Sequence, residues 1–498
     1  LIDGTRAELL DAYVPVGARS IRISDSTPFA VGDRVLIRWS GNDAWHQALR
    51  MDEDHLGDEA WTTGMIDLDF DRVVTRLEVI DGEHWLTVDC PLPNAIEARY
   101  STFTPYVQAY TWERRNEQIG VEHLRSVSPV TGDSDEQHAW HMVRMHRTRD
   151  GWVRRVTAVG YGRSVYRGSG SRITVRDCRY LDPASEVRGN RRYAFSTTGQ
   201  QELVIDCLAE DAIQVYAIEH ETPGPIAIVD CVSDAEWSDS GPHRHWGAGV
   251  LWDNLQATGR WQFVDGTFVG RGEDRGTDRP DEPLAFRHGG MPAADPQSFR
   301  VSVTVRRLDP AVRPALVARV AEVYDRAFIY LELDHDALRL KIFQGWTYGN
   351  DFAELASAPY PADFDPLATH RLTVINDGKR MHCLLDGEEL FAHETGIYDN
   401  RAYVGLRVVD GEAAFDDFVV TDVDGSTDYL RDDFTDPDIR PWLHRNAQRM
   451  AGLYIQNRGT LGTGHGWSGA NNIIWNGDAQ IYIVQNPPTA HNWLIGAR

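Results

Sequence analysis

Three short phrases recur between residues 135 and 254: Val175-Arg-Asp-Cys178, Val204-Ile-Asp-Cys207 and Ile228-Val-Asp-Cys231. Their cysteines are 29 and 24 residues apart (207 − 178 and 231 − 207). Each phrase closes a short apolar or β-branched run that has no helical period. A repeat of this length made of strands is typical of a solenoid, in which each coil buries its apolar side against the next. We therefore expect the cysteines to stack about 4.8 Å apart as an internal ladder of small side chains.

Polar and aromatic residues gather just before strands of these coils. The segments are Asp135-Glu136-Gln-His138-Ala-Trp140-His141, Arg191-Arg192-Tyr193, Asp239-Ser-Gly-Pro-His243-Arg244-His245-Trp246 and Gly464-His465-Gly-Trp467. Aligned on the cysteines, they fall at the same phase of the coil, so we predict that they line one groove. The first and fifth coils are four strand spacings apart, on the order of 19 Å, so a groove of this length could hold several units of an extended polymer.

Composition restricts the partners of the chain. The formal net charge is −25 and the pI about 5.1, which argues against nucleic acid or an anionic membrane as a bulk partner. An acidic substrate would have to be attracted locally, near Arg192 and Arg244. The lysines are Lys341 and Lys379, so the repeat region contains no lysine base. No apolar run approaches the roughly 18–20 residues of a membrane span.

Cysteine usage and the first residue bear on compartment and cofactors. Five cysteines without paired short spacings are not a disulfide framework, and no zinc pattern appears. Since the chain begins at Leu1 and not at Met, we expect that a signal peptide or further N-terminal sequence has been removed, and we expect an extracellular or periplasmic location. We expect no required cofactor, leave Ca²⁺ open, and expect a monomer or small homo-oligomer.

The coil pattern stops and later returns. After Asp253-Asn254 come longer alternating strands with hairpin turns at Asn376-Asp-Gly378 and Asp386-Gly387, and the coil pattern resumes at Gly452-Leu-Tyr-Ile-Gln-Asn457. We predict an all-β protein: a parallel β-helix interrupted by an antiparallel β-sandwich. The predicted domains are an N-terminal β module that caps the solenoid (1–115), the first part of the β-helix (116–258), the inserted sandwich (259–445) and the last coils (446–498).

The coils resemble the right-handed parallel β-helix of the pectate-lyase-like superfamily. The resemblance covers roughly residues 10–255 and 445–498 and rests on the segments 135–140, 239–246 and 462–471. The interrupting segment resembles the concanavalin/laminin-G-like jelly rolls that accompany many glycan-active enzymes. These resemblances imply a carbohydrate-active enzyme. The calcium-ligand motif of true pectate lyases and the paired-aspartate motifs of polygalacturonases have no match here, so neither mechanism transfers residue by residue.

Three functions remain open. In a polysaccharide lyase, arginines would neutralise a uronate carboxylate, His243 or His245 would remove the neighbouring proton, and Tyr193 or another imidazole would protonate the leaving oxygen. In a glycoside hydrolase, Asp135 or Glu136 would work with Asp239. A non-catalytic glycan-binding solenoid is the third hypothesis. Substrate-binding residues in the groove would be Arg192, His138, Trp246, His465 and Trp467, although turns and loop packing also use residues of these types.

Overall fold

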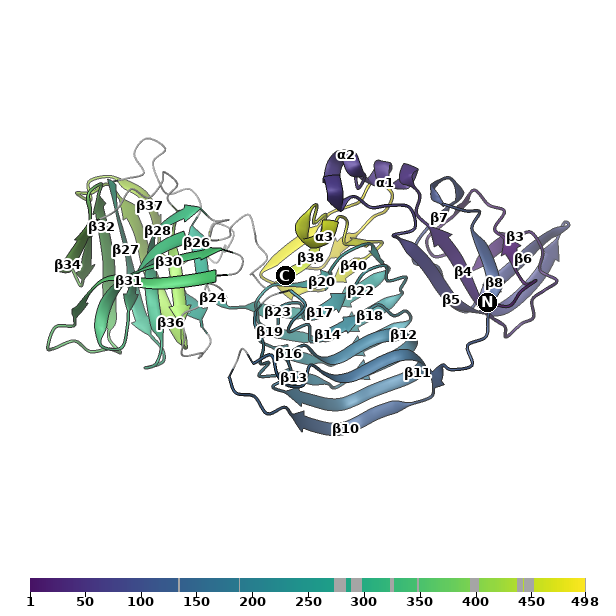
Figure 1. Ribbon diagram of the computed structural model, residues 1–498, viewed down its shortest axis with the longest axis horizontal. Helices are drawn as coiled ribbons and strands as arrows, with labels where there is room; N and C mark the ends of the chain where they lie inside the picture. Colours follow the sequence, from purple (N-terminus) through teal and green to yellow (C-terminus); the bar gives the residue numbers. More distant parts are fainter. Residues whose placement is uncertain are drawn as a thin grey trace. The chain divides into compact units, whose positions relative to one another are not determined.

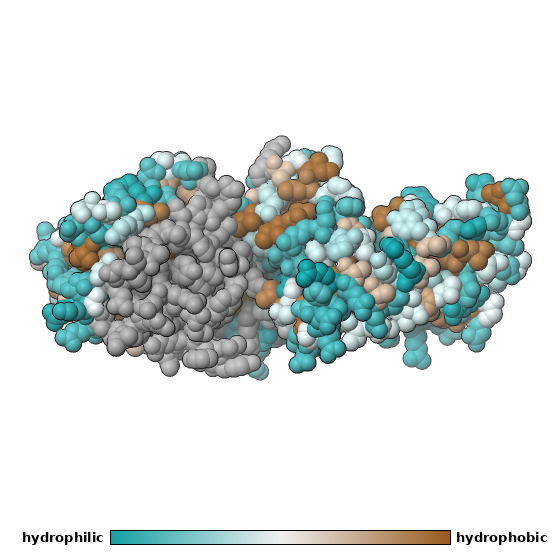
Figure 2. All heavy atoms as spheres, turned by 90° about the horizontal axis from the view of Figure 1, so that it is seen from above, coloured by the Kyte–Doolittle hydropathy of each residue, from teal (hydrophilic) through white to brown (hydrophobic). Residues whose placement is uncertain are grey.

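A computed structural model describes residues 1–132, 135–187, 189–272, 284–287, 298–322, 327–346, 349–394, 403–436, 442 and 452–497. The chain divides into two compact units, unit 1 (1–258 with 451–498) and unit 2 (259–450) (Figure 1). Both are built of strands, which confirms the all-β prediction. None of the described helices is long and apolar enough to cross a membrane. On the described surface of Figure 2, apolar residues form small groups among polar ones.

Unit 1 begins with a six-stranded antiparallel sheet. Its order is β1 (Ala7–Glu8), β8 (Tyr106–Ala109), β4 (Arg34–Ser40), β5 (Asp67–Ile80), β6 (Glu83–Val88) and β3 (Ser20–Ile23). A turn at Asp81-Gly82 joins β5 to β6, with φ of 52° and 84°. Between β4 and β5 lie α1 (Asp43–Leu49) and α2 (Glu53–Leu56). Asn42 caps α1, since its side chain accepts a hydrogen bond from the Trp45 amide at 3.0 Å.

Parallel strands in the rest of unit 1 stack in three columns after β10 (Gly120–Val127). Column A contains the start of β11 (His141–Val159), the start of β12 (Ser164–Arg176), β14 (Phe195–Thr197), β17 (Tyr216–Ile218), β20 (Asp239–Pro242), β38 (Gly452–Ile455) and β42 (Ile481–Val484). Column B contains the later parts of β11 and β12, then β15 (Glu202–Ile205), β18 (Ile226–Val229), β22 (Val250–Asp253), β40 (Ile473–Trp475) and β43 (Trp493–Ile495). Column C contains the end of β11, then β13 (Arg179–Leu181), β16 (Leu208–Glu210), β19 (Val232–Glu236), β23 (Gln256–Gly259) and β41 (Asp478–Ala479).

One pass through columns A, B and C is one coil. Coil 1 is β11, coil 2 is β12 and β13, coil 3 begins at β14, coil 4 at β17, coil 5 at β20 and coil 6 at β38. Coils 5 and 6 are neighbours although unit 2 separates them in sequence, because Asp239 in β20 pairs with Gly452 in β38. The chain therefore leaves the stacked coils after column C of coil 5 and returns to them in column A of coil 6.

The repeated phrases form the core between columns B and C. Cys178, Cys207 and Cys231 are free thiols, at most 2% exposed, and belong to one apolar cluster, which confirms the predicted internal ladder. In column A, the rings of Phe195 and Tyr216 stack within the same core at a centroid distance of 5.2 Å. Each coil thus contributes one layer of side chains to a continuous interior.

The residue before each of these cysteines forms the corner from column B to column C. Asp177, Asp206 and Asp230 have φ of 54°, 56° and 50°, and Asn254 and Asn476 continue the series at 51° and 48°. Asp and Asn tolerate this left-handed conformation better than most residues. The Asp-Cys pair in the repeat is therefore a turn residue followed by a core residue.

Unit 2 consists of two antiparallel sheets, as the alternating sequence predicts. One sheet contains β24 (Trp261–Val264), β25 (Thr267–Arg271), β36 (Glu412–Thr421), β27 (Ser298–Arg307), β32 (Thr369–Asp377), β33 (Arg380–Leu385) and β34 (Glu388–Glu394), with β37 (Asp428–Asp432) beside β36. The other contains β26 (Leu284–Arg287), β35 (Tyr403–Val409), β28 (Arg313–Glu322), β29 (Ala327–Leu333), β30 (Ala337–Trp346) and β31 (Gly349–Pro359). The predicted turns at 376–378 and 386–387 join β32 to β33 and β33 to β34.

Candidate active site

The connections from column A to column B carry a group of titratable side chains in unit 1. These connections lengthen along the stack. The connection is residue 170 in coil 2, residues 219–225 in coil 4, 243–249 in coil 5 and 456–472 in coil 6. The longer connections hold His243, His245 and His465, which we call the imidazole cluster. The ring centroids of His243 and His465 are 5.1 Å apart, and those of His245 and His465 are 6.0 Å apart.

The imidazole cluster is neutral at pH 7. Burial, with the nearby arginines acting in the same direction, lowers the pKa of His245 to about 4 and that of His465 to about 3. Burial, followed by the charge of Arg458, holds the pKa of His243 well below its usual value. His245 Nε2 and His465 Nδ1 are buried without a hydrogen-bond partner among the described residues. These two nitrogens are available to take or give a proton.

Two guanidinium groups lie within the cluster without a carboxylate. Arg458 Nη1 donates to His243 Nδ1 at 2.9 Å and to the His243 carbonyl at 2.5 Å, while its Nε is buried with no partner in the described part of the chain. Arg244 is half-buried, and its charge lowers the pKa of all three imidazoles. Among the described residues, neither arginine forms an ion pair with an acidic side chain. The site is therefore suited to an anionic group of a ligand.

Tyr193 approaches the cluster from the other end of column A. Its ring lies 5.4 Å from that of His243, and the Arg163 guanidinium lies 5.4 Å from the Tyr193 ring. Burial raises the pKa of Tyr193, so the phenol carries its proton at neutral pH. Arg163 is held by Glu219, at 2.8 Å, and Glu219 also contacts Arg167 at 3.4 Å. These contacts neutralise Glu219.

Small residues form the outer side of column A beneath these groups. Ser196 pairs with Ala217, and Ala217 with Gly241. They alternate with the core residues Phe195 and Tyr216, so they lie on the other face of column A, where Ser196 and Ala217 are nonetheless buried. A side chain at Gly241 would lie 2.3 Å from the Tyr454 carbonyl oxygen, so glycine is needed there. The Ser196 hydroxyl is buried without a partner in the described part of the chain.

The predicted single phase is wrong. Segments 135–141 and 191–193 precede column A, whereas 243–246 and 464–467 follow it, so the polar residues lie on two different turns. The alignment on cysteines did not separate them because the length of each connection changes from coil to coil. Tyr193 still meets His243 because the strands of column A are only three or four residues long in coils 3 to 5.

The other predicted residues before column A serve the local structure. Asp135 accepts hydrogen bonds from the Thr131 and Gln137 amides and closes a turn. Glu136 is bound by Arg191, at 3.0 Å, and by Ser185. His138 bonds the carbonyls of Ala139 and Ala184. Arg192 is fully buried, bonded to the Ser185 carbonyl and to Asp211. The structure does not bring these four residues to the imidazole cluster.

Three more predicted residues are used in packing. Trp246 is 1% exposed, meets Trp45 edge to face at 4.7 Å and donates to Asn94 Oδ1. The Trp467 indole donates to the Leu49 carbonyl at 3.0 Å. Both join the coils to the N-terminal sheet and its helices. Asp239, in β20, is 2% exposed and accepts a hydrogen bond from Ser238.

Sequence reasoning missed Arg163, Glu219 and Arg458. Asp239 in coil 5 pairs with Gly452 in coil 6. The A-to-B connection of coil 6, which contains Arg458, therefore corresponds to the connection of coil 5 that contains His243. An alignment of these two coils across unit 2 would have revealed that relation. Nothing in the sequence marks Arg163 and Glu219, because their ion pair joins coil 2 to coil 4.

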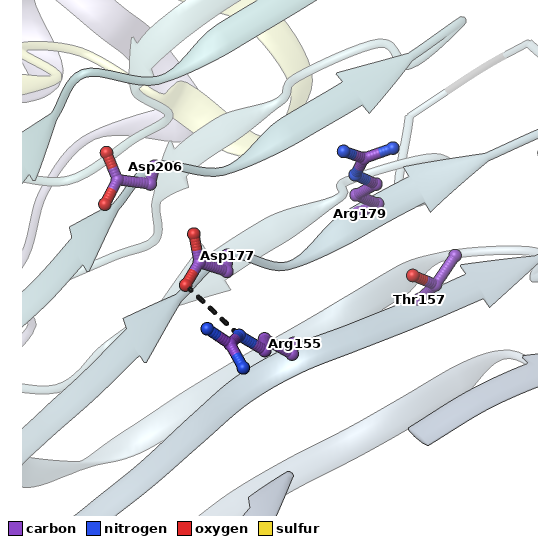
Figure 3. A pocket seen from close by; sticks show the side chains of 5 residues that line it. All are labelled: Arg155, Thr157, Asp177, Arg179 and Asp206. Atoms are coloured by element: carbon purple, nitrogen blue, oxygen red, sulfur yellow. Dashed lines mark ion pairs between the residues drawn. The ribbon is translucent and has the colours of Figure 1, made fainter. Parts of the chain in front are cut away.

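A hollow lies at the B-to-C corner. It measures about 360 Å³ and is lined by Arg155, Thr157, Asp177, Arg179 and Asp206 (Figure 3). Arg155 lies 3.9 Å from Asp177, and both side chains are substantially exposed. Its groups are ordinary surface charges, so we assign it no chemistry. Among the described residues, no three His, Cys, Asp or Glu side chains are placed to hold a metal ion.

Comparisons with known proteins name no family. No protein-family model and no curated protein matches the chain. Among solved structures, the carbohydrate-binding module CBM66 from Bacillus subtilis is 18% identical over 32% of this chain and 89% of that one, with a TM-score of 0.25. The catalytic domain of a laminarinase from Thermotoga petrophila is 12% identical over 32% and 79%, with a TM-score of 0.22. The alginate lyase AlgAT5 is 10% identical over 32% and 81%, with a TM-score of 0.21. At TM-scores this low, these similarities do not establish the fold or the function of the present chain.

Proposed function

We propose that this protein is a carbohydrate-active enzyme that cleaves a uronate-containing polysaccharide by β-elimination. One observation carries the proposal: two guanidinium groups with no carboxylate partner among the described residues lie among three neutral imidazoles and a protonated tyrosine. We further propose that the three columns form a right-handed parallel β-helix, that the protein acts outside the cytoplasm, and that it requires no cofactor.

Arg244 and Arg458 would bind the uronate carboxylate. Two positive charges stabilise the additional negative charge that develops on this carboxylate when the neighbouring carbon loses its proton. Electrostatic stabilisation at the point where charge develops is commonly the largest contribution to such a step. Because the cluster is buried, these charges are less screened than they would be at the surface.

The imidazoles would handle the protons. An arginine N–H can only donate, so His243 Nδ1 is an acceptor and the proton of the neutral ring is on Nε2. His243 is therefore suited to donate, whereas His465 Nδ1 and His245 Nε2 lack partners among the described residues and either could accept. We assign His465 or His245 as the base, and His243 with Tyr193 as the proton donor.

The step balances as follows. The C–H bond next to the carboxylate breaks and its proton passes to the base. The electron pair forms a carbon–carbon double bond as the glycosidic C–O bond breaks. The leaving oxygen takes a proton from His243 or Tyr193, and solvent restores both groups.

The carboxylates fit the hydrolase hypothesis less well. A general acid of a glycoside hydrolase needs a raised pKa. Burial raises the pKa of Glu136, but hydrogen bonds from Ser185, the Glu186 amide and Arg191 outweigh it and leave that pKa lowered. Glu219 is paired with two arginines, and Asp239 is nearly inaccessible. A non-catalytic glycan binder would not need three neutral imidazoles beside two arginines that have no carboxylate partner among the described residues.

The test is a screen of uronate-containing and neutral polysaccharides, followed by ultraviolet absorbance of the unsaturated product and by a reducing-end assay. We expect both signals to rise together. Arg458→Ala and His465→Gln should each lower kcat/KM by about 100-fold or more, whereas His491→Gln, at an exposed histidine of the same unit, should leave it unchanged. Reducing ends without absorbance would refute β-elimination and favour hydrolysis. Glycan binding without either signal would favour the non-catalytic solenoid.

A further inference from the structure

An acidic pocket of about 750 Å³ lies in the N-terminal part of unit 1, around α1, α2 and residues 57–63. Its carboxylates are Asp43, Asp52, Glu53, Asp54 and Asp58. Positive charge nearby is limited: His55 pairs with Asp52 at 2.5 Å, and Arg50 also acts on Asp52. The wall of the pocket therefore remains strongly negative and selects for a cation.

A buried side chain in the same wall, without a partner in the described part of the chain, indicates a binding role for the pocket. His46 lines the pocket and is 1% exposed, yet neither of its ring nitrogens has a hydrogen-bond partner among the described residues. Buried polar groups are nearly always satisfied by protein, water or ligand. Trp61, 3% exposed, also lines the pocket, and its ring lies 6.2 Å from that of His46.

We propose that this pocket binds an amino sugar through its protonated amine. The carboxylates would bind the ammonium, and the His46 ring together with Gln47, Thr62 and Thr63 offers hydrogen bonds to hydroxyl groups. A bare metal ion fits less well, because no three potential ligands converge among the described residues. The volume suits a ligand of sugar size, and an indole in the wall is a typical surface for sugar contact.

The pocket adjoins the imidazole cluster through Trp61. The ring of this indole also lies 5.9 Å from the ring of His245, and its N–H donates to the Gly464 carbonyl at 2.9 Å. An anion-binding site and a cation-binding site thus share one side chain. If the proposed lyase function holds, the substrate class is a polysaccharide in which uronates neighbour sugars with free amines.

Calorimetric titration of the full chain with glucosamine, N-acetylglucosamine, glucose and calcium chloride tests the pocket without relying on turnover. We expect glucosamine to bind and N-acetylglucosamine and glucose to bind at least about tenfold more weakly, because they lack the charge. The double variant Asp54→Asn/Asp58→Asn should weaken glucosamine about fivefold or more. Glu113→Gln, at an exposed carboxylate outside the pocket, should not.

Equal affinity for glucosamine and N-acetylglucosamine, or binding of neither, would overturn the proposal. Binding of calcium in competition with glucosamine would show that the pocket is a metal site and would also overturn it. Failure here leaves the lyase proposal intact, because the polysaccharide screen measures product formation. Conversely, glucosamine would still bind if the imidazole cluster proved inactive.

Discussion

Acidification should destabilise unit 1 through the imidazole cluster. His245 and His465 are 5% and 9% exposed, and burial lowers their pKa values to about 4 and about 3. In the unfolded chain a histidine titrates near 6.5. Between these values the unfolded state binds more protons than the folded state. Folding stability is therefore fully present above pH 6.5 and is lost as pH falls toward 3.

The size of the effect follows from proton linkage. Between pH 7 and pH 5, each of these two imidazoles should remove about 2 kcal/mol of unfolding free energy, or about 4 kcal/mol together. His243 acts in the same direction, because its pKa is also lowered. A loss of this size is a substantial part of the 5–15 kcal/mol that is typical for a folded domain.

Urea unfolding at pH 7 and pH 5, followed by tryptophan fluorescence, measures this loss. Thirteen of the 16 tryptophans report on unit 1, since only Trp261, Trp346 and Trp442 belong to residues 259–450. Other groups titrate in the same pH range. The informative quantity is therefore the difference between the wild type and a variant in the unfolding free energy that each loses between pH 7 and pH 5. His245→Gln and His465→Gln should each reduce the loss by about 2 kcal/mol, and the exposed His491→Gln should not change it.

If both glutamine variants lose as much stability on acidification as the wild type, the imidazoles are not buried neutral groups. That result would also remove the physical basis for assigning one of them as the catalytic base.

Three further predictions concern the core and the contacts of the coils. Burial raises the pKa of Glu202 to about 7, so the contribution of the protonated carboxyl to folding stability is present below pH 4.5 and is lost as pH rises through 7. In urea unfolding, Glu202→Gln should therefore have an unfolding free energy about 3 kcal/mol higher than the wild type at pH 8 and the same as the wild type at pH 4. Phe195→Ala removes a ring stacked on Tyr216 and should cost unit 1 about 3–5 kcal/mol, which a calorimetric scan would show as a lowered Tm; an unchanged scan would contradict the core assignment. Trp246→Phe keeps an aromatic ring but loses the hydrogen bond to Asn94 and should cost about 1–2 kcal/mol in the same scan, whereas no change would mean that water replaces the bond.

The sequence alone determined the periodic part of this protein. The Asp-Cys phrases identified a buried ladder position, because a small thiol fits an internal stack, whereas the left-handed corner at the preceding aspartate became visible only in the structure. Alternating apolar residues and Asp-Gly or Asn-Asp-Gly turns identified the antiparallel strands of unit 2. These features depend on neighbours within a few residues, so a local pattern is sufficient to predict them.

The candidate site was predicted only in part. The sequence singled out His243, Arg244, His245, His465 and Tyr193, which the structure brings together. It also placed Arg192, His138, Trp246 and Trp467 in the same groove, where the structure uses them for local bonds and packing. Residue type and phase cannot separate these two groups, because the orientation of each side chain depends on the length of its connection.

Only the tertiary structure decided which charges converge. Arg458 reaches His243 because coil 6 stacks on coil 5 after a long interruption, and Trp61 reaches His245 because a loop of the N-terminal part packs on the coils. Such contacts depend on the stacking register and on packing between distant segments, which no local pattern encodes. The sequence therefore predicts the repeating strands of each coil, whereas the three-dimensional packing decides which charged and titratable side chains of different coils lie together.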